Sequence, residues 1–279
     1  MTVDLRNIQS YVINLDKNIE KYSEIKTKFK TLNITNIQRF SAIYGKDLDE
    51  KYIDNITNPY VQYIIHHGRF TDSDIGSYGA IGCYISHVKL WEMLLNVKQN
   101  QDMFLVLEDD AIPLEKYTIF DINNFINEVI ENTKNWDIIY LGYAKRPRDN
   151  DIEITKNVYK IDSMVFQTHA YIINKKGITK LLKFALPMVF ELDSFISFMS
   201  MYRNLNSYRS KDSYIVQSNV KSSDIHNTNK ELKVYLNGID TNNIKIILWM
   251  VFMILFLFVF FILLYFYKYI RKYFYKYYP

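Results

Sequence analysis

The chain contains 279 residues, of which 49% are hydrophobic and 23% charged, and it carries a formal net charge of +4. This composition is that of a globular protein and excludes a disordered chain. Much of the positive charge lies near the C-terminus, which argues against a nucleic-acid partner, and the single cysteine, Cys83, excludes an internal disulfide. We expect Cys83, which lies among apolar residues, to be a small buried hydrophobic residue rather than a nucleophile.

The hydrophobic pattern predicts strands that alternate with helices along most of the chain. In the first half we expect a strand over 11–15, a helix over 16–32, a strand over 38–42, a helical stretch over 49–67 that Pro59 interrupts, and an amphipathic helix over 82–97. In the second half we expect a strand over 104–107, a helix over 120–132, a strand over 138–141 that ends at Gly142, a strand over 171–173, helices over 176–184 and 193–205, and a strand over 214–216. This alternation favours an α/β fold with a mostly parallel sheet and flanking helices on both faces.

Two common phosphate-binding motifs are missing from the sequence. Neither a GxGxxG pattern after the first expected strand nor a GxxxxGK[ST] pattern occurs. The chain is therefore not expected to contain an ordinary dinucleotide site or a P-loop.

A long uncharged segment near the C-terminus predicts a membrane-spanning helix. Residues 246–267 contain no charged side chain, and their length matches the ~20 apolar residues that cross a bilayer. We assign 227–243 to a polar linker, 244–267 to one transmembrane helix, and 268–279 to a basic aromatic tail that suits an anionic lipid surface. The basic tail favours a cytosolic C-terminus. The absence of an N-terminal signal peptide instead favours insertion as a tail anchor, which leaves the large domain in the cytosol. We favour the second topology, with a cytosolic domain.

An apolar run breaks abruptly into three acids at Glu108, Asp109 and Asp110. Residues 104–107 fit a buried strand, so the acids would stand at its C-terminal end, where open α/β sheets bind ligands. Three adjacent carboxylates repel one another unless a cation or hydrogen bonds offset their charge, and Mg²⁺ and Mn²⁺ take oxygen ligands. The pattern therefore predicts a divalent-cation site; acids that cap a helix or face water are the alternative.

Several segments, taken in order, resemble one enzyme family. They are residues 12–16, 39–46, 79–87 with Trp91, 107–111, 170–177 and 192–193. The most specific part is the pairing of Gly-Cys-x-x-Ser-His, at 82–87, with Glu-Asp-Asp, at 108–110. Over residues 8–226 the order and spacing resemble glycosyltransferase family 25, which includes lipooligosaccharide and procollagen galactosyltransferases.

The resemblance implies a GT-A-like, Rossmann-related domain over residues 1–226. It further implies a UDP-sugar donor, Mn²⁺ or Mg²⁺ as cofactor, and inverting transfer of galactose or glucose, as in lipopolysaccharide biosynthesis. Two positions depart from the family pattern. Lys17 and Lys21 are the nearest bases where the family often has paired arginines, and Glu191 stands where it often has proline.

The acids are expected to hold the cofactor. We expect Asp110 to be the first metal ligand, together with Asp109, and Glu108 to reach the donor ribose or to order the water around the metal. Either His226 or Asp224 would add a later ligand, although both lie in a polar linker where solvated residues are the default.

Other residues are candidates for catalysis and for donor binding. Asp193 is our candidate base for the inverting displacement, and a helix N-cap is its alternative role. Asn14 and Lys17 are expected to contact the donor nucleotide and its phosphate. Ser86 and the candidate catalytic residue His87 would contact the donor phosphate or the acceptor, with a satisfied core histidine as the alternative for His87. Weaker candidates are His169, Arg146 and Arg148.

The sequence therefore predicts a membrane-tethered, metal-dependent hexosyltransferase. Its expected partners are a UDP-hexose donor, a glycan or glycoprotein acceptor and the lipid bilayer. The alternative is a non-catalytic relative that binds glycans or acts as a membrane scaffold. A nucleotidyltransferase is disfavoured, because no Gly-rich basic phosphate loop follows the first expected strand.

Overall fold

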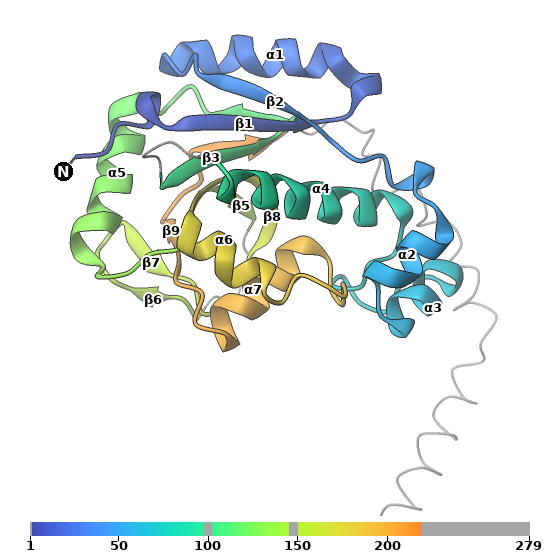
Figure 1. Ribbon diagram of the computed structural model, residues 1–279. Helices are drawn as coiled ribbons and strands as arrows, with labels where there is room; N and C mark the ends of the chain where they lie inside the picture. Colours follow the sequence, from blue (N-terminus) through green and yellow to red (C-terminus); the bar gives the residue numbers. More distant parts are fainter. Residues whose placement is uncertain (1, 98–101, 145–149, 219–279) are drawn as a thin grey trace, which may run out of the picture. The chain divides into compact units, whose positions relative to one another are not determined.

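The computed structural model describes residues 2–97, 102–144 and 150–218, all of which belong to one unit of the chain, Met1–Thr228. Its centre is an eight-stranded sheet in the order β2-β1-β3-β8-β5-β9-β7-β6 (Figure 1). β4 and β10 form a separate two-stranded sheet. The strands are β1 Gln9–Asn14, β2 Ile37–Ser41, β3 Met103–Glu108, β4 Ala111–Pro113, β5 Ile138–Ala144, β6 Ile152–Glu153, β7 Val158–Lys160, β8 Phe166–Asn174, β9 Ser207–Ser210 and β10 Ile215–Gln217. The α-helices are α1 Ile19–Phe29, α2 Glu50–Ile56, α3 Pro59–His67, α4 Tyr78–Leu95, α5 Ile119–Asn132, α6 Lys175–Leu182 and α7 Leu192–Tyr202.

Six of the eight strands of the main sheet point in one direction, and β8 and β7 are reversed. The predicted α/β class, with a mostly parallel sheet and flanking helices, is confirmed. The expected alternation of strand and helix stops after β5, because the described residues between β5 and β8 form no helix. β8 runs antiparallel to both of its neighbours in the sheet, β3 and β5.

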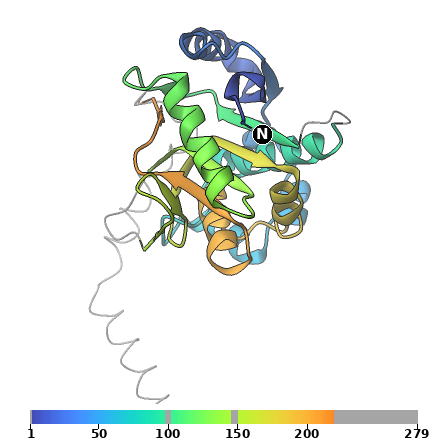
Figure 2. The ribbon, with the colours of Figure 1, turned by 90° about the vertical axis from the view of Figure 1, so that its left-hand side faces the viewer.

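Successive residues of the central strands face two separate apolar cores. Phe104 and Val106 of β3 pack on the side of α2, α3, α4, α6 and α7. Leu105 and Leu107 pack on the side of α1 and α5. Helices therefore cover both faces of the sheet (Figures 1 and 2), which explains why these strands read as continuous apolar runs.

Two details of the strands differ from the sequence-based expectation. β5 does not end at Gly142 but continues to Ala144, with a shift of register against β8 at this point. A Cβ atom on Gly142 would lie 2.2 Å from Nε2 of His169, so the glycine serves a close side-chain approach rather than a strand end. The late strand, β10, pairs with β4 outside the main sheet.

No helix of the described residues is both long enough and apolar enough to span a bilayer. The expected linker over 227–243, transmembrane helix over 244–267 and basic tail over 268–279 lie outside the described residues. These three assignments stay predictions.

Candidate active site

The three acids lie at the edge of the sheet where β1 and β3 end. Glu108 is the last residue of β3 and pairs in register with Ile13 of the parallel strand β1. Asp109 and Asp110 form the turn that leads into β4. The prediction that the acids follow a buried strand at its C-terminal end is confirmed, since residues 104–107 are fully buried.

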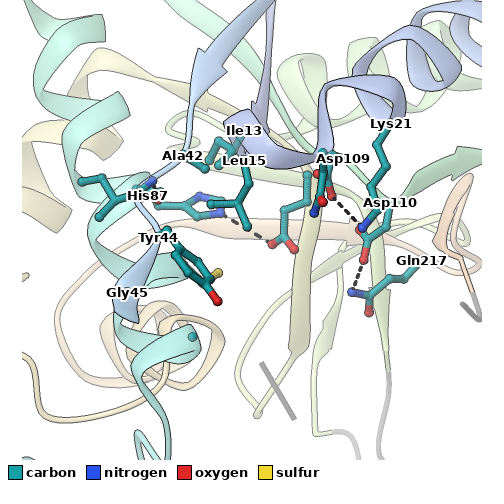
Figure 3. A pocket seen from close by; sticks show the side chains of 16 residues that line it. Ile13, Leu15, Lys21, Ala42, Tyr44, Gly45, His87, Asp109, Asp110 and Gln217 are labelled. Carbon is teal, nitrogen blue, oxygen red and sulfur yellow. Dashed lines mark hydrogen bonds and ion pairs between the residues drawn. The ribbon is translucent and has the colours of Figure 1, made fainter. Parts of the chain in front are cut away.

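Asp109 is held by partners within the chain. Its Oδ2 accepts a hydrogen bond of 2.8 Å from Asn14 Nδ2. Its Oδ1 lies 3.9 Å from Lys21 Nζ, and Figure 3 shows both of these side chains. Asn14 is itself oriented by Arg39, whose Nε donates to Asn14 Oδ1 at 2.8 Å. Much of the negative charge of Asp109 is therefore already offset, and the amide of Asn14 is fixed at the end of β1.

Asp110 keeps an unsatisfied oxygen. Its Oδ2 accepts a hydrogen bond of 2.7 Å from Gln217 Nε2, whereas its buried Oδ1 has no hydrogen-bond partner among the residues that the structure describes (Figure 3). Burial, followed by the charge of Glu108, raises the pKa of Asp110 to about 7. A buried carboxylate in this state is stabilised by an added cation.

Glu108 contacts a network of polar side chains in the protein interior. Thr168 Oγ1 donates to Glu108 Oε1 at 2.7 Å, and Nε2 of His87 lies 3.5 Å from the same oxygen. On the other side of the imidazole, Nδ1 of His87 lies 2.8 Å from the hydroxyl of Tyr171, which also accepts a hydrogen bond from Trp91 Nε1. Burial raises the pKa of Glu108, but the nearby imidazole of His87 and the hydrogen bond from Thr168 outweigh burial and hold this pKa below its ordinary value. The alternative, a core histidine with all its hydrogen bonds made, therefore holds for Nδ1 of His87 but not for Nε2, which has no hydrogen-bond partner among the described residues.

Two glycines allow the first half of α4 to pack closely against the loop that follows β2. A Cβ atom on Gly45 would lie 1.6 Å from the carbonyl oxygen of Tyr78, and one on Gly82 would lie 2.6 Å from that of Ile43. Ser86 reinforces the contact, because its Oγ accepts from Ile43 N at 2.8 Å and donates to the Gly82 carbonyl at 2.6 Å. The hydroxyl of Ser86 thus supports the wall of the site.

Two adjoining hollows open at this edge of the sheet. The first lobe encloses about 750 Å³, part of it open to solvent, between the ends of β1 and β3, the loop after β2 and α4. The second lobe encloses about 560 Å³ near the start of β8 and the start of α7. Cys83, Glu108 and Gln217 line both lobes and form the neck between them. Cys83 is half-buried at this neck, which differs from the small buried residue that we expected.

Asp193 and Glu191 bring two carboxylates to the second lobe. Asp193 accepts backbone hydrogen bonds from Gln167 N at 3.1 Å and from Ser194 N at 2.6 Å, while burial raises its pKa. Glu191 Oε1 lies 3.6 Å from Arg69 Nη1, and burial, followed by the charge of Asp193, raises the pKa of Glu191 to about 7. The alternative role of Asp193 as an N-cap is wrong, because the N-cap of α7 is Glu191, which makes no side-chain capping bond.

The structure brings most of the predicted site residues to one place. Those that line or support the first lobe are Asn14, Ser86, His87, Glu108, Asp109 and Asp110. Lys17 contacts the wall of this lobe from outside, with Nζ 4.0 Å from the centre of the Tyr44 ring. The ring of His169 instead bonds the Ile215 carbonyl through Nε2 at 3.0 Å. Predicted residues that lie outside the described part of the chain are Arg146, Arg148, Asp224 and His226.

Two residues of the site were not found from the sequence. Gln217 bonds Asp110, and Thr168 bonds Glu108. The only sequence signal for Gln217 is its position directly after the expected strand over 214–216. Thr168 precedes the strand expected over 171–173 and carries no signal of its own.

Comparison with known proteins links the chain to one family. Residues 7–196 match the family described as glycosyltransferase family 25 (LPS biosynthesis protein). A protein of Anopheles gambiae named glycosyltransferase 25 family member is 26% identical over 174 residues, which cover 62% of this chain and 28% of that protein. Procollagen galactosyltransferase 1 of Danio rerio is 30% identical over 138 residues, which cover 47% of this chain and 22% of that protein.

The chain spans less than a third of the length of these curated relatives. Among solved structures, a putative glucose-1-phosphate thymidylyltransferase from Bacillus anthracis is 11% identical with a TM-score of 0.38, covering 84% of this chain and 96% of that chain. A TM-score of 0.38 is too low to identify the fold.

Proposed function

This chain belongs to glycosyltransferase family 25, and on that premise we propose that it transfers galactose or glucose from a UDP-sugar to a hydroxyl group of a glycan or protein, with inversion. We include in the proposal a GT-A-like arrangement of the domain. The observation that carries the proposal is an unsatisfied buried carboxylate oxygen, on Asp110, beside two hollows that meet at a common neck. Transfer between two substrates requires adjoining sites of this kind. The galactosyltransferase name of the zebrafish relative supports a hexose as the group transferred.

The acids fit Mn²⁺ or Mg²⁺ on the side of the first lobe. Asp110 would hold the ion through Oδ1, which has no hydrogen-bond partner among the described residues, with Asp109 alongside. Hard cations are commonly bound by one or two carboxylates, with water and substrate phosphate in the remaining positions. When bound, the ion supplies positive charge to the diphosphate leaving group. Asp110 is the principal ligand, since Asp109 already contacts Asn14 and Lys21.

The donor nucleotide is placed in the first lobe. This lobe is partly open to solvent and is lined by Asp109 and Asp110. Lys21 contributes a positive charge close to Asp109, where the diphosphate would lie. The ring of Tyr44 forms a flat part of the wall, with Lys17 stacked on it. These residues would orient the nucleotide so that its sugar points to the neck.

The acceptor is placed in the second lobe, where Asp193 would remove the proton from the attacking hydroxyl. This carboxylate is half-buried in the wall of the lobe, and its bonds to Gln167 N and Ser194 N fix its orientation. We expect Asp193→Asn to lower kcat by about 10²–10⁴-fold, as removal of a general base does. Glu191→Gln, two residues away in the same lobe, is the matched comparison. A larger loss of kcat in Glu191→Gln would move the role of base to Glu191.

The cation site is tested with Asp110→Asn, which keeps the shape of the side chain but removes its charge. We expect the variant to bind UDP in the presence of Mn²⁺ at least about tenfold more weakly by calorimetry, and to lose UDP release from UDP-galactose or UDP-glucose. A chelator should have the same effect on the wild type. Asp54→Asn, which alters an exposed carboxylate on α2, should leave both properties unchanged.

Unchanged Mn²⁺-dependent UDP binding in Asp110→Asn would refute the cation site. If the wild type itself binds no nucleotide in the presence of Mn²⁺, the alternative of a non-catalytic glycan-binding or scaffolding relative gains support instead.

A further inference from the structure

A second group of donor atoms lies at the neck between the two lobes, apart from Asp109 and Asp110. Sγ of Cys83, Nε2 of His87 and a carboxylate oxygen of Glu108 all lie within 4.8 Å of one another. The separation between His87 Nε2 and Glu108 Oε1 is 3.5 Å. Tetrahedral zinc, with bonds of about 2.0–2.3 Å, requires its donor atoms to be roughly 3.3–3.6 Å apart. A small side-chain movement therefore suffices for the three groups to converge on one ion.

The backbone already places these groups in suitable positions. Cys83 and His87 are four residues apart on α4, so they lie on the same face of the helix, one turn from each other. Glu108 approaches this face from the end of β3. The contact between Gly45 and Gly82 fixes the first half of α4 in place, because neither glycine leaves room for a side chain.

His87 gives an independent indication of a ligand. Its ring is fully buried, yet Nε2 has no hydrogen-bond partner among the described residues. Nδ1 lies beside the hydroxyl of Tyr171, which can accept a hydrogen bond from an Nδ1–H group. In that tautomer the lone pair of Nε2 faces Cys83 and Glu108, and the bond from Nδ1–H orients the ring, as is usual for a histidine that binds a metal.

We propose that Cys83, His87 and Glu108 bind a borderline-soft divalent cation such as Zn²⁺, at a site distinct from that of Asp110. Thiolate and imidazole ligands select zinc over Mn²⁺ and Mg²⁺, which prefer oxygen. The fourth position of the ion opens to the neck, because Cys83 and Glu108 line both lobes. On binding, the S–H bond of Cys83 breaks and a sulfur–metal bond forms. The thiol proton goes to solvent, and His87 keeps its proton on Nδ1.

The full-length chain with Co²⁺ as a probe tests this proposal. Because Cys83 is the single cysteine of the chain, a thiolate-to-Co²⁺ charge-transfer band in the near ultraviolet reports on this residue alone. We expect the band in the wild type and its loss when one equivalent of Zn²⁺ is added. Cys83→Ser should lack the band and bind Zn²⁺ at least about tenfold more weakly, and His87→Gln should also bind it more weakly. Asp110→Asn should retain the band, which separates this site from the proposed Mn²⁺ site.

Three results would overturn the proposal: a folded wild type without the band, unchanged Zn²⁺ affinity in Cys83→Ser, or loss of the band in a folded Asp110→Asn. Circular dichroism of each variant checks its fold. Should Cys83→Ser fail to fold, alkylation of Cys83 in the wild type replaces it. Zn²⁺ is then expected to slow alkylation at least about tenfold, and an unchanged rate would equally refute the site.

Discussion

At the scale of single residues, the second lobe contains a carboxyl group whose ionisation opposes folding. Burial and the charge of Asp193 raise the pKa of Glu191 from its ordinary 4.5 to about 7. The folded chain therefore binds this proton more tightly than the unfolded chain does. The resulting stabilisation is complete below pH 4.5 and is lost as the pH rises to about 7. At about 1.4 kcal/mol for each pKa unit, the loss is at most about 3.5 kcal/mol.

Glu191→Gln removes this titration and so changes how stability depends on pH. Relative to the wild type, the variant is expected to gain about 1–3 kcal/mol in free energy of unfolding between pH 4.5 and pH 8. Urea unfolding of both proteins at the two pH values measures the difference. Glu92→Gln, which alters an exposed carboxylate on α4, serves as the control. An equal difference between variant and wild type at both pH values would contradict the expectation.

Individual site residues differ in how far the sequence could reveal them. The acids at 108–110 were predictable, because three adjacent carboxylates directly follow an apolar strand and their mutual repulsion can be seen in the sequence alone. The contact between Gln217 and Asp110 joins residues 107 positions apart, and a neutral amide in a polar stretch carries no local signature. The orientation of His87 likewise depends on Tyr171, which reaches it from a different strand. Roles that arise from such tertiary contacts cannot be inferred from spacing alone.

At the scale of secondary-structure elements, the site depends on close backbone contact between α4 and the loop after β2. Gly82→Ala would place a methyl group 2.6 Å from Gly45 N and from the Ile43 carbonyl, and neither backbone atom can move freely. We expect destabilisation of about 1–3 kcal/mol, as is typical of overpacking, together with weaker UDP binding because the wall of the first lobe shifts. Chemical denaturation and calorimetry measure the two effects.

Gly76→Ala is the matched control for this substitution. The three atoms nearest to its added methyl group would be side-chain atoms of Arg69, at 3.1–3.4 Å, and a flexible side chain can move aside. Gly76→Ala should therefore lower the free energy of unfolding by much less than Gly82→Ala does. Equal losses in the two variants would show that the contact between α4 and the loop does not define the wall.

The elements that the sequence predicted well are those with long apolar runs or a clear helical face. Four short strands, β4, β6, β7 and β9, were missed, and β9 shows why. Its four residues, Ser207–Ser210, are all buried although three of them are serine or arginine. Arg209 is tolerated in this interior because its Nε bonds to the buried carboxylate of Asp151, far away in the sequence. Periodicity could not indicate this strand, since its burial depends on a polar partner.

At the scale of the whole chain, the uncharged segment over 246–267 requires a different environment from the described domain. That domain buries its apolar side chains in two cores on either side of a sheet. The segment instead has apolar side chains at almost every position, so an isolated helix of this sequence would expose them on all sides. A bilayer satisfies such a helix, which is why we expect the full chain to stay with membranes after carbonate extraction.

Phe256→Arg combined with Leu257→Arg tests the span at its centre. Each arginine costs about 2.5–3.5 kcal/mol at the middle of a transmembrane helix, so the double variant should be released by carbonate. Tyr273→Arg combined with Tyr275→Arg adds the same charge within the basic tail and should stay bound, because the tail is expected at the lipid surface. Retention of the central variant would exclude a spanning helix. If both variants are released, charge added anywhere in this region weakens membrane binding. A helix that spans the bilayer does not predict this result.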